Sequence, residues 1–378
     1  MAGEREPIHC SLAYSGFALR HNGSPSPCCQ WKFHEVKNIT ALEWWETDRY
    51  IKEVRSRIIS DLENGIKHVG CSQCWTEESA GLKSLRQQSN QLIHFKNSPK
   101  DYTVLDLELN LGTLCNLRCI MCGPYASSLW ETEYKLNPEK NKPWHYIFEK
   151  QSWVDDPKFL IWLTPFLKTV RRINFSGGEP LIIPQFESVI DQIISLGREK
   201  KIQITMNTNL TKLPKKLLSN LSKFKGVNIM VSLEGVGIKN DYLRFPSKWN
   251  DIQNNINLIN NYSNINIEVH HTIQHSSIYA LPELIDFCNL TQINNFHINT
   301  VQGKPQLELS GVPENDIKKF LKWANSSKLP HNLNSMIPSI KETKFDIETY
   351  NLFRKYVAYI DSINGTDWDD TFSPSKVL

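Results

Sequence analysis

The alternation of strand-like and helical segments after residue 100 limits the fold more than any other feature of this chain. Between the strand-like runs the apolar residues recur at helical spacing, as in 184–196, which is followed by Gly197 as a C-terminal cap. Strands separated by helices indicate parallel βα units, and therefore a barrel or an open sheet. We then expect active-site groups on the loops at the carboxyl ends of the strands. The six predicted strands lie near 104–110, 171–176, 202–207, 226–233, 265–273 and 295–300.

The segments on either side of this alternating region have different patterns. Residues 9–29 read as two short strands around a turn at 21–23, and Cys71 and Cys74 are expected on a turn. Thr40 and Glu43 form a capping box for a helix over about 41–64. A polar helix is predicted over 77–95, and two more over 313–325 and 346–363, before a turn-rich tail. The sequence therefore predicts three parts, which are residues 1–100, 101–304 and 305–378.

Composition excludes several classes of protein. The chain has 378 residues with 40% hydrophobic and 22% charged residues, an ordinary globular composition. A net charge of +3 argues against a nucleic-acid partner. The N-terminus has no apolar signal segment, and the apolar run 226–233 is far too short for a membrane span. We expect a cytoplasmic protein with no membrane partner.

The cysteines are crowded into one third of the chain. Eight of the nine lie before residue 123, and only Cys288 lies outside, in a helix whose apolar neighbours predict a core position. Thiols stay reduced in the cytoplasm, so clustered cysteines there usually bind metal or perform redox chemistry rather than form disulfides.

Three of these cysteines directly follow the first predicted strand. Cys115, Cys119 and Cys122 are separated by three and then two residues, so a short loop can wrap three thiolates around one centre. Three thiolates on a [4Fe–4S] cluster leave the fourth iron free of protein ligands, and an open position is where a cofactor or substrate binds. A zinc site remains the alternative, although zinc sites usually pair two Cys-x2-Cys motifs.

The spacing Cys115-x3-Cys119-x2-Cys122 resembles the cluster motif of the radical S-adenosylmethionine (radical SAM) enzymes. Met121 departs from the aromatic residue that is common at its position in that family. The second predicted strand ends in Gly177-Gly178-Glu179-Pro180, where two glycines let the backbone approach a ligand. In the resembling family this stretch contacts the amino group of S-adenosylmethionine.

The resemblance also implies a reaction and its cofactors. One electron from a [4Fe–4S] cluster on the three catalytic cysteines would cleave S-adenosylmethionine to methionine and a 5′-deoxyadenosyl radical, which would abstract hydrogen from the substrate. Flavodoxin or ferredoxin would supply the electron. Ser232 and Glu234 end the fourth strand, in a stretch that resembles the Ser-hydrophobic-Asp-Gly segment of many relatives, and Arg244 follows. Ser232 and Arg244 are predicted contacts of the cofactor's ribose or carboxylate.

The N-terminal cysteines form a second set, and the spacing of Cys10, Gly23 and Cys28 resembles the auxiliary-cluster domains called SPASM and twitch. Four thiolates can complete a second, fully ligated [4Fe–4S] cluster, but they suit a structural zinc equally well. Adjacent cysteines rarely face one metal, so Cys28 is preferred over Cys29, which is expected to be a packed thiol. Glu78, Gly81 and Arg86 add to the likeness. The predicted auxiliary ligands are Cys10, Cys28, Cys71 and Cys74.

The resemblance implies an α/β fold, in which a partial (β/α)6 radical SAM barrel follows a small cysteine-rich twitch-like domain and precedes a helical C-terminal extension. Three functions stay open from the sequence. The first is a radical SAM enzyme, acting on a peptide or protein side chain or on a small molecule. The second is a non-enzymatic iron–sulfur electron-transfer protein, and the third is a zinc-binding interaction protein.

Overall fold

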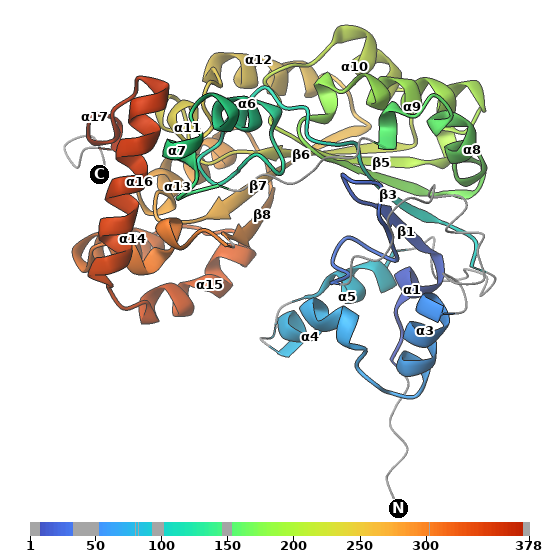
Figure 1. Ribbon diagram of the computed structural model, residues 1–378, viewed down its shortest axis with the longest axis horizontal. Coiled ribbons are helices and arrows are strands. Elements are labelled where there is room, and N and C mark those ends of the chain that lie inside the picture. Colours follow the sequence, from blue (N-terminus) through green and yellow to red (C-terminus); the bar gives the residue numbers. More distant parts are fainter. Residues whose placement is uncertain are drawn as a thin grey trace, which may run out of the picture. The chain divides into compact units, whose positions relative to one another are not determined.

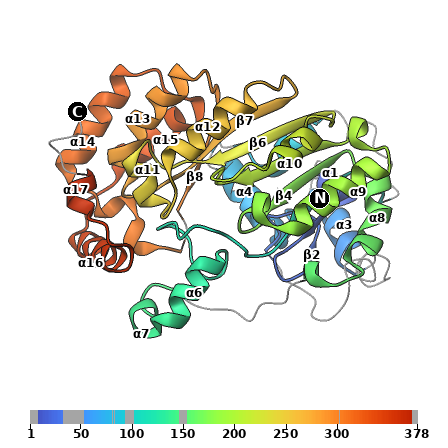
Figure 2. The ribbon, with the colours of Figure 1, turned by 90° about the horizontal axis from the view of Figure 1, so that it is seen from above.

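The computed structural model describes residues 8–32, 53–79, 81, 83–92, 102–145, 153–301 and 303–372. The chain divides into two compact units that interleave along the sequence (Figures 1 and 2). The first unit comprises Met1–Gly112, Glu149–Met206 and Ser219–Val227, and the second comprises Thr113–Phe148, Asn207–Leu218 and Asn228–Leu378.

Five strands of the first unit lie side by side in the order β2-β1-β3-β4-β5. All neighbouring pairs are parallel except β1 with β2. Leu107 pairs with Ile173, and Ile173 with Ile204, so buried apolar side chains align across the strands. In Figure 1 the helices α8 and α9 cover β4 and β5. The bounds are β1 (Gly16–Leu19), β2 (Pro25–Ser26), β3 (Asp106–Asn110), β4 (Arg172–Ser176), β5 (Gln203–Thr208), α8 (Phe159–Thr169) and α9 (Pro184–Ser195).

The N-terminal segment joins this sheet. Strands β1 and β2 lie on either side of the predicted turn 21–23, but Ser11–Ser15, which were predicted as part of the first strand, form the short helix α1. The parallel pairing of β1 with β3 was not predicted. All four residues of β1 are buried, which is typical of a strand that is covered on both faces and pairs inside a sheet. Arg55, which is fully buried, donates from its guanidinium to the carbonyls of Ala13 and Gly16 at 2.5 and 2.6 Å.

The helices of the cysteine-rich segment differ from their predicted bounds. The prediction of one helix over 77–95 is wrong, because the structure has α4 (Ser72–Ser79) and α5 (Leu85–Asn90). Gly81 between them has a φ of +75°, which ends the first helix, and Ser84 begins the second with a capping box to Gln87. The prediction of Cys74 on a turn is also wrong, since it lies in α4. α3 (Ser56–Glu63) falls within the helix predicted over 41–64, whose start is outside the described residues.

The second unit holds β7 and β8, which pair in parallel, most of β6 and most of the described helices. The strands agree with the predicted 226–233, 265–273 and 295–300, as do α14 and α16 with the two predicted helices. α15 and α17 were not predicted. The bounds are β6 (Gly226–Ser232), β7 (Ile265–Ile273), β8 (Asn295–Thr300), α6 (Ser128–Leu136), α11 (Ile238–Leu243), α12 (Trp249–Ile259), α13 (Ser277–Leu290), α14 (Glu314–Ser326), α15 (His331–Glu342), α16 (Ile347–Asn364) and α17 (Trp368–Phe372).

Side chains of this unit alternate along each strand between an apolar and a polar face. In β6 the residues Val227, Ile229 and Val231 are buried, whereas Asn228 and Ser232 on the other face are only half-buried. Such alternation is typical of a sheet with one face packed on helices and one face left for a ligand or solvent. Cys288 is buried in α13, which confirms its predicted core position.

The described helices include none whose length and apolar character would suffice to cross a membrane.

Candidate functional site

The loop that carries Cys115, Cys119 and Cys122 has no regular secondary structure, and other elements of the second unit hold its backbone. The N–H of Ile120 donates to the carbonyl of Leu243 at 3.0 Å. The indole N–H of Trp130, on α6, donates to the carbonyl of Cys119 at 2.9 Å. The hydroxyl of Tyr356, on α16, donates to the carbonyl of Ile120 at 2.6 Å. Trp130 and Tyr356 are fully buried, so these bonds fix the loop in a dry environment.

Arg118, inside the same loop, ties it to two helices. Its guanidinium pairs with Glu133 of α6 at 2.8 Å and donates to the side chain of Asn364, the last residue of α16, at 2.8 Å. It also lies over the ring of Phe245 at 5.3 Å. The C-terminal helix α16 therefore helps to shape the cysteine loop, a role that the sequence did not indicate.

The three thiols lie close enough to affect one another. Burial raises the pKa of Cys119 well above its ordinary value, and the neighbouring Cys122 and Cys115 raise it further, against the opposing effect of Arg244. Burial likewise raises the pKa of Cys122. Thiols that repel each other as thiolates in a dry loop are suited to a positively charged ligand such as iron, which deprotonates them.

Arg244 is the first of two buried cations that face these thiols. Its guanidinium donates to Glu234 at 3.2 Å, and only 11% of its side chain is exposed. Burial would lower the pKa of Arg244, but Cys119, Glu234 and the other two thiols raise it overall. The Nε of Arg244 is buried and has no hydrogen-bond partner among the described residues.

Glu234 keeps Arg244 in place through contacts with β7. Its second carboxylate oxygen accepts from the N–H of Thr272 at 3.1 Å and lies 3.2 Å from Nδ1 of His271. Burial raises the pKa of Glu234 to about 8, although Arg244 and the Thr272 N–H favour the carboxylate. Of the two predicted contacts, Arg244 is therefore held by Glu234, and Ser232 is half-buried at the end of β6.

The second cation is Lys304, which follows β8. It is 6% exposed, and its ammonium lies 3.2 Å from Nδ1 of His145 and donates to the carbonyl of Trp144 at 3.3 Å. Burial lowers the pKa of Lys304 to about 8, and the nearby Cys122 acts in the opposite direction. The sequence analysis did not single out Lys304 or His145. The only signal in the sequence for Lys304 is its position just after the last predicted strand, where active-site residues are expected.

The predicted cofactor stretch 177–180 lies in the first unit, directly after β4. Gly177 has a φ of +135°, and a Cβ there would lie 2.8 Å from the carbonyl oxygen of Gly112, so no other residue fits. The N–H of Gly178 donates to the same carbonyl at 2.8 Å. Glu179 is buried, and its carboxylate accepts from the N–H of Leu181 at 3.0 Å. The two glycines therefore bring the strand ends β3 and β4 into close contact.

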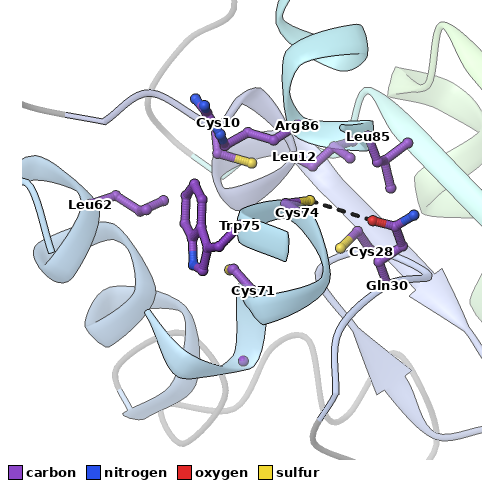
Figure 3. A pocket seen from close by; sticks show the side chains of 11 residues that line it. Cys10, Leu12, Cys28, Gln30, Leu62, Cys71, Cys74, Trp75, Leu85 and Arg86 are labelled. Carbon is purple, nitrogen blue, oxygen red and sulfur yellow. Dashed lines mark hydrogen bonds between the residues drawn. The ribbon is translucent and has the colours of Figure 1, made fainter. Parts of the chain in front are cut away.

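The predicted auxiliary cysteines converge on a single pocket of the first unit. Figure 3 shows their sulfur atoms directed toward a common space beside Trp75, from four different positions along the chain. The structure thus brings together all four cysteines that the sequence analysis selected. The pocket is lined by Cys10, Leu12, Cys28, Gln30, Leu62, Gly70, Cys71, Cys74, Trp75, Leu85 and Arg86.

Burial dominates the chemistry of this pocket as well. It raises the pKa of Cys10 to about 11 and that of Cys71 to about 12, and the thiols raise each other's pKa further. Arg86, which lines the pocket, forms a two-pronged pair with Glu78 at 2.8 and 3.0 Å. Its guanidinium lies 5.2 Å from the ring centre of Trp75. Glu78 and Arg86, which the sequence analysis associated with the cysteine module, are thus a structural pair at its edge.

Cys29 lies outside this pocket. Its thiol is hydrogen-bonded to the side chain of Glu108, on β3, and burial raises its pKa well above the ordinary value. Cys28 and Cys29 lie in a turn after β2, and their side chains have different surroundings. Among the described residues, no three His, Cys, Asp or Glu side chains are placed to hold a single metal ion.

A model of the radical SAM superfamily matches residues 109–279, which include the loop 115–122 and the stretch 177–180. Residues 109–279 are thus similar to a radical SAM domain. Members of this superfamily are enzymes, and the family implies a [4Fe–4S] cluster and S-adenosylmethionine. The domain has an α/β fold with a parallel sheet and helices.

Similar proteins include curated relatives of this domain. The Fe-coproporphyrin III synthase of Methanosarcina barkeri is 27% identical over 41% of this chain and 32% of its own length. The molybdenum cofactor biosynthesis protein 1 of Dictyostelium discoideum is 25% identical over 69% of this chain and 35% of its own length. The chain thus spans about a third of the length of these relatives.

Solved structures with a radical SAM enzyme's cofactor also resemble the chain. Native anSMEcpe with bound AdoMet has a TM-score of 0.45 and 15% identity, over 64% of this chain and 68% of that one. Streptococcus suis SuiB bound to S-adenosylmethionine has a TM-score of 0.38 and 16% identity, over 85% and 68% of the two chains.

Proposed function

We propose that this chain is a radical SAM enzyme that cleaves S-adenosylmethionine reductively and abstracts hydrogen from a substrate. One observation carries the proposal. Three thiols, of which Cys119 is buried and Cys115 and Cys122 are half-buried, share one firmly held loop and face the cations Arg244 and Lys304. The Nε of Arg244 is a buried donor with no hydrogen-bond partner among the described residues, and an electron carrier or a zinc-binding module has no need of such a donor beside its thiols.

The residues of this loop fit an iron–sulfur cluster. Thiolates are the ligands such clusters take, and three of them leave one iron open. The two cations supply positive charge beside the negative charge of three thiolates. The Nε of Arg244 is a buried donor without an acceptor among the described residues, so a ligand could supply one. When bound, the cluster supplies one electron to the sulfonium of S-adenosylmethionine, giving methionine and a 5′-deoxyadenosyl radical.

The chain's own residues hold the cluster, orient the cofactor and exclude water from the site. Cys115, Cys119 and Cys122 hold the cluster, and the bonds from Trp130 and Tyr356 keep their loop from moving. Glu234 orients Arg244, whose guanidinium we assign to the carboxylate of S-adenosylmethionine, an arrangement in which two parallel hydrogen bonds can form. Ser232 and the stretch 177–180 complete the proposed cofactor contacts.

We further propose that the N-terminal pocket holds a second, auxiliary [4Fe–4S] cluster through Cys10, Cys28, Cys71 and Cys74. Four converging thiols in an apolar pocket beside Trp75 support this assignment. With four thiolates such a cluster has no open iron, and it would transfer electrons or stabilise the fold.

Several expectations stay part of this proposal. The division into a twitch-like module (1–100), a partial (β/α)6 barrel (101–304) and a helical extension (305–378) remains a prediction, as does a cytoplasmic location. The electron donor would be a flavodoxin or a ferredoxin. The substrate is either a peptide or protein side chain or a small molecule.

The experiment that tests the function needs no knowledge of the substrate. The protein is purified without oxygen, supplied with iron and sulfide, reduced with dithionite and given S-adenosylmethionine. We expect about eight iron ions per chain and the formation of 5′-deoxyadenosine and methionine, measured by chromatography and mass spectrometry. A fully loaded and reduced protein that forms no 5′-deoxyadenosine would contradict the proposal, and zinc without iron would indicate an interaction protein.

A further inference from the structure

Lys304 is buried at the carboxyl end of β8, where the chain turns into the short helix Pro305–Leu307. Its ammonium lies within hydrogen-bond distance of the carbonyl of Trp144 and of Nδ1 of His145. Both partners are uncharged acceptors, so neither supplies a counter-charge. A buried ammonium without a counter-charge is costly, because it has lost the stabilisation that water gives it.

His145 is built to hold the ammonium of Lys304. Burial lowers the pKa of His145 to about 3, and Lys304 acts in the same direction, so the imidazole is neutral. The contact with the ammonium makes Nδ1 the acceptor and assigns the proton to Nε2, which has no partner among the described residues. The ring is wedged against Trp130, with ring centres 4.4 Å apart, and cannot turn away without disturbing the core.

Other buried cations of the second unit have a carboxylate partner. Lys239 pairs with Glu283 at 2.6 Å, Arg118 with Glu133 at 2.8 Å, and Arg244 with Glu234 at 3.2 Å. In the described part of the chain, Lys304 forms no such ion pair. The ammonium lies next to the cysteine loop instead: a Cβ built on Gly123, the residue after Cys122, would lie 3.0 Å from Nδ1 of His145, the atom that the ammonium contacts. Cys122 and Trp144 also pack against the same buried cluster of side chains.

We propose that Lys304 is the counter-charge of the iron–sulfur cluster held by Cys115, Cys119 and Cys122, and that it raises the cluster's reduction potential. Reduction adds one electron, and hence one negative charge, to the cluster. A fixed positive charge beside Cys122 stabilises the reduced form more than the oxidised form. His145 is a positioning residue, because it acts only by holding the ammonium. This inference rests on the proposed function, since it requires the cluster.

The test compares cluster-loaded variants at Lys304. Lys304→Met removes the charge and keeps the length of the side chain, Lys304→Gln removes the charge and keeps polarity, and Lys304→Arg keeps the charge. Lys239→Met is the matched control, because it removes a buried ammonium that pairs with Glu283 instead. The midpoint potential of the cluster whose electron paramagnetic resonance signal changes on adding S-adenosylmethionine is measured by redox titration.

We expect the potential to become more negative in both neutral variants, so that the ratio of reduced to oxidised cluster at a fixed potential falls on the order of tenfold. Lys304→Arg and Lys239→Met should keep the wild-type potential. If Lys304→Met does not fold, the comparison of Lys304→Gln with Lys304→Arg decides. A neutral variant that holds its cluster at an unchanged or more positive potential overturns the inference. A wild-type protein that binds no iron, or forms no 5′-deoxyadenosine, contradicts the proposed function instead, so the two failures are distinguishable.

Discussion

The two groups of cysteines differ in how their charge is balanced. The loop with Cys115, Cys119 and Cys122 faces Arg244 and Lys304, and at least one of these cations has no carboxylate partner of its own in the described structure. The N-terminal pocket has Arg86, whose charge is already balanced by Glu78. A site with surplus positive charge suits a group that gains electrons and binds a carboxylate, whereas a neutral, apolar pocket suits a closed and permanently held group. The difference in charge, apart from the number of thiols, is what would distinguish the proposed catalytic site from the proposed auxiliary site.

The largest effect should come from breaking the loop site alone. Cys119→Ala should abolish formation of 5′-deoxyadenosine and halve the iron content, because the first cluster loses a ligand and the second does not. Cys74→Ala should also halve the iron content, but the remaining iron should still respond to S-adenosylmethionine in its spectrum. The measurements are iron analysis and the product assay. Retained cleavage in Cys119→Ala would refute the assignment of the loop.

The pocket site can be tested by two neighbouring substitutions. Cys28→Ala should lose the auxiliary cluster, because Cys28 lines the pocket, and Cys29→Ala should keep it, because that thiol contacts Glu108. Iron content and visible absorption of the two variants give the answer. Equal loss in both, or loss only in Cys29→Ala, would show that the ligand set is wrong.

A smaller effect is expected from Glu234→Ala. The guanidinium of Arg244 would lose its acceptor, so binding of S-adenosylmethionine should weaken on the order of tenfold, which is about the value of one hydrogen bond to a charged group. The iron content should not change. Glu283→Ala, which unpairs Lys239, is the control. An unchanged KM for S-adenosylmethionine in Glu234→Ala would mean that Arg244 does not bind the cofactor.

The bond from α16 to the loop should affect stability modestly. Tyr356→Phe leaves the carbonyl of Ile120 without its donor in a dry environment, so we expect a loss of about 1–3 kcal/mol in the free energy of unfolding. Tyr350→Phe on the same helix, where the side chain is partly exposed, is the control. Denaturant unfolding measures both, and equal stability of the two variants would contradict a clamping role for Tyr356.

The smallest effect concerns acid stability of the cysteine-rich segment. Burial acts to raise the pKa of Glu78, but Arg86 and Ser84 together hold it below its ordinary value of 4.5. A carboxyl whose folded pKa is lowered adds stability that is present above its unfolded pKa and is lost as the pH falls through the folded value. Between about pH 6 and about pH 3, the wild type should lose at most about 1 kcal/mol more than Glu78→Gln. Parallel acid titrations followed by circular dichroism would show this, and identical acid sensitivity would contradict it.

Much of the fold follows from local patterns in the sequence. All six predicted strands are present, because each is a short apolar run bounded by turn residues, and that signal needs no tertiary context. The helix predicted over 77–95 failed because Gly81 and Ser84 interrupt a polar segment without apolar periodicity. α15 and α17 went unpredicted because their exposed or short segments bury few residues, and so leave little periodic signal.

The sequence by itself determined where the candidate ligands lie along the chain. It shows two sets of cysteines, places one set in the loop after β3, and ends the next strand in two glycines. These features depend only on the spacing of residues along the chain, which is the same whatever fold the chain adopts. Only the tertiary structure decided the electrostatics. It brought Lys304 to Cys122 across some 180 residues and gave Arg244 its partner Glu234, and it separated Cys28 from Cys29. Charge interactions depend on distance and burial, and neither is written in the order of the residues.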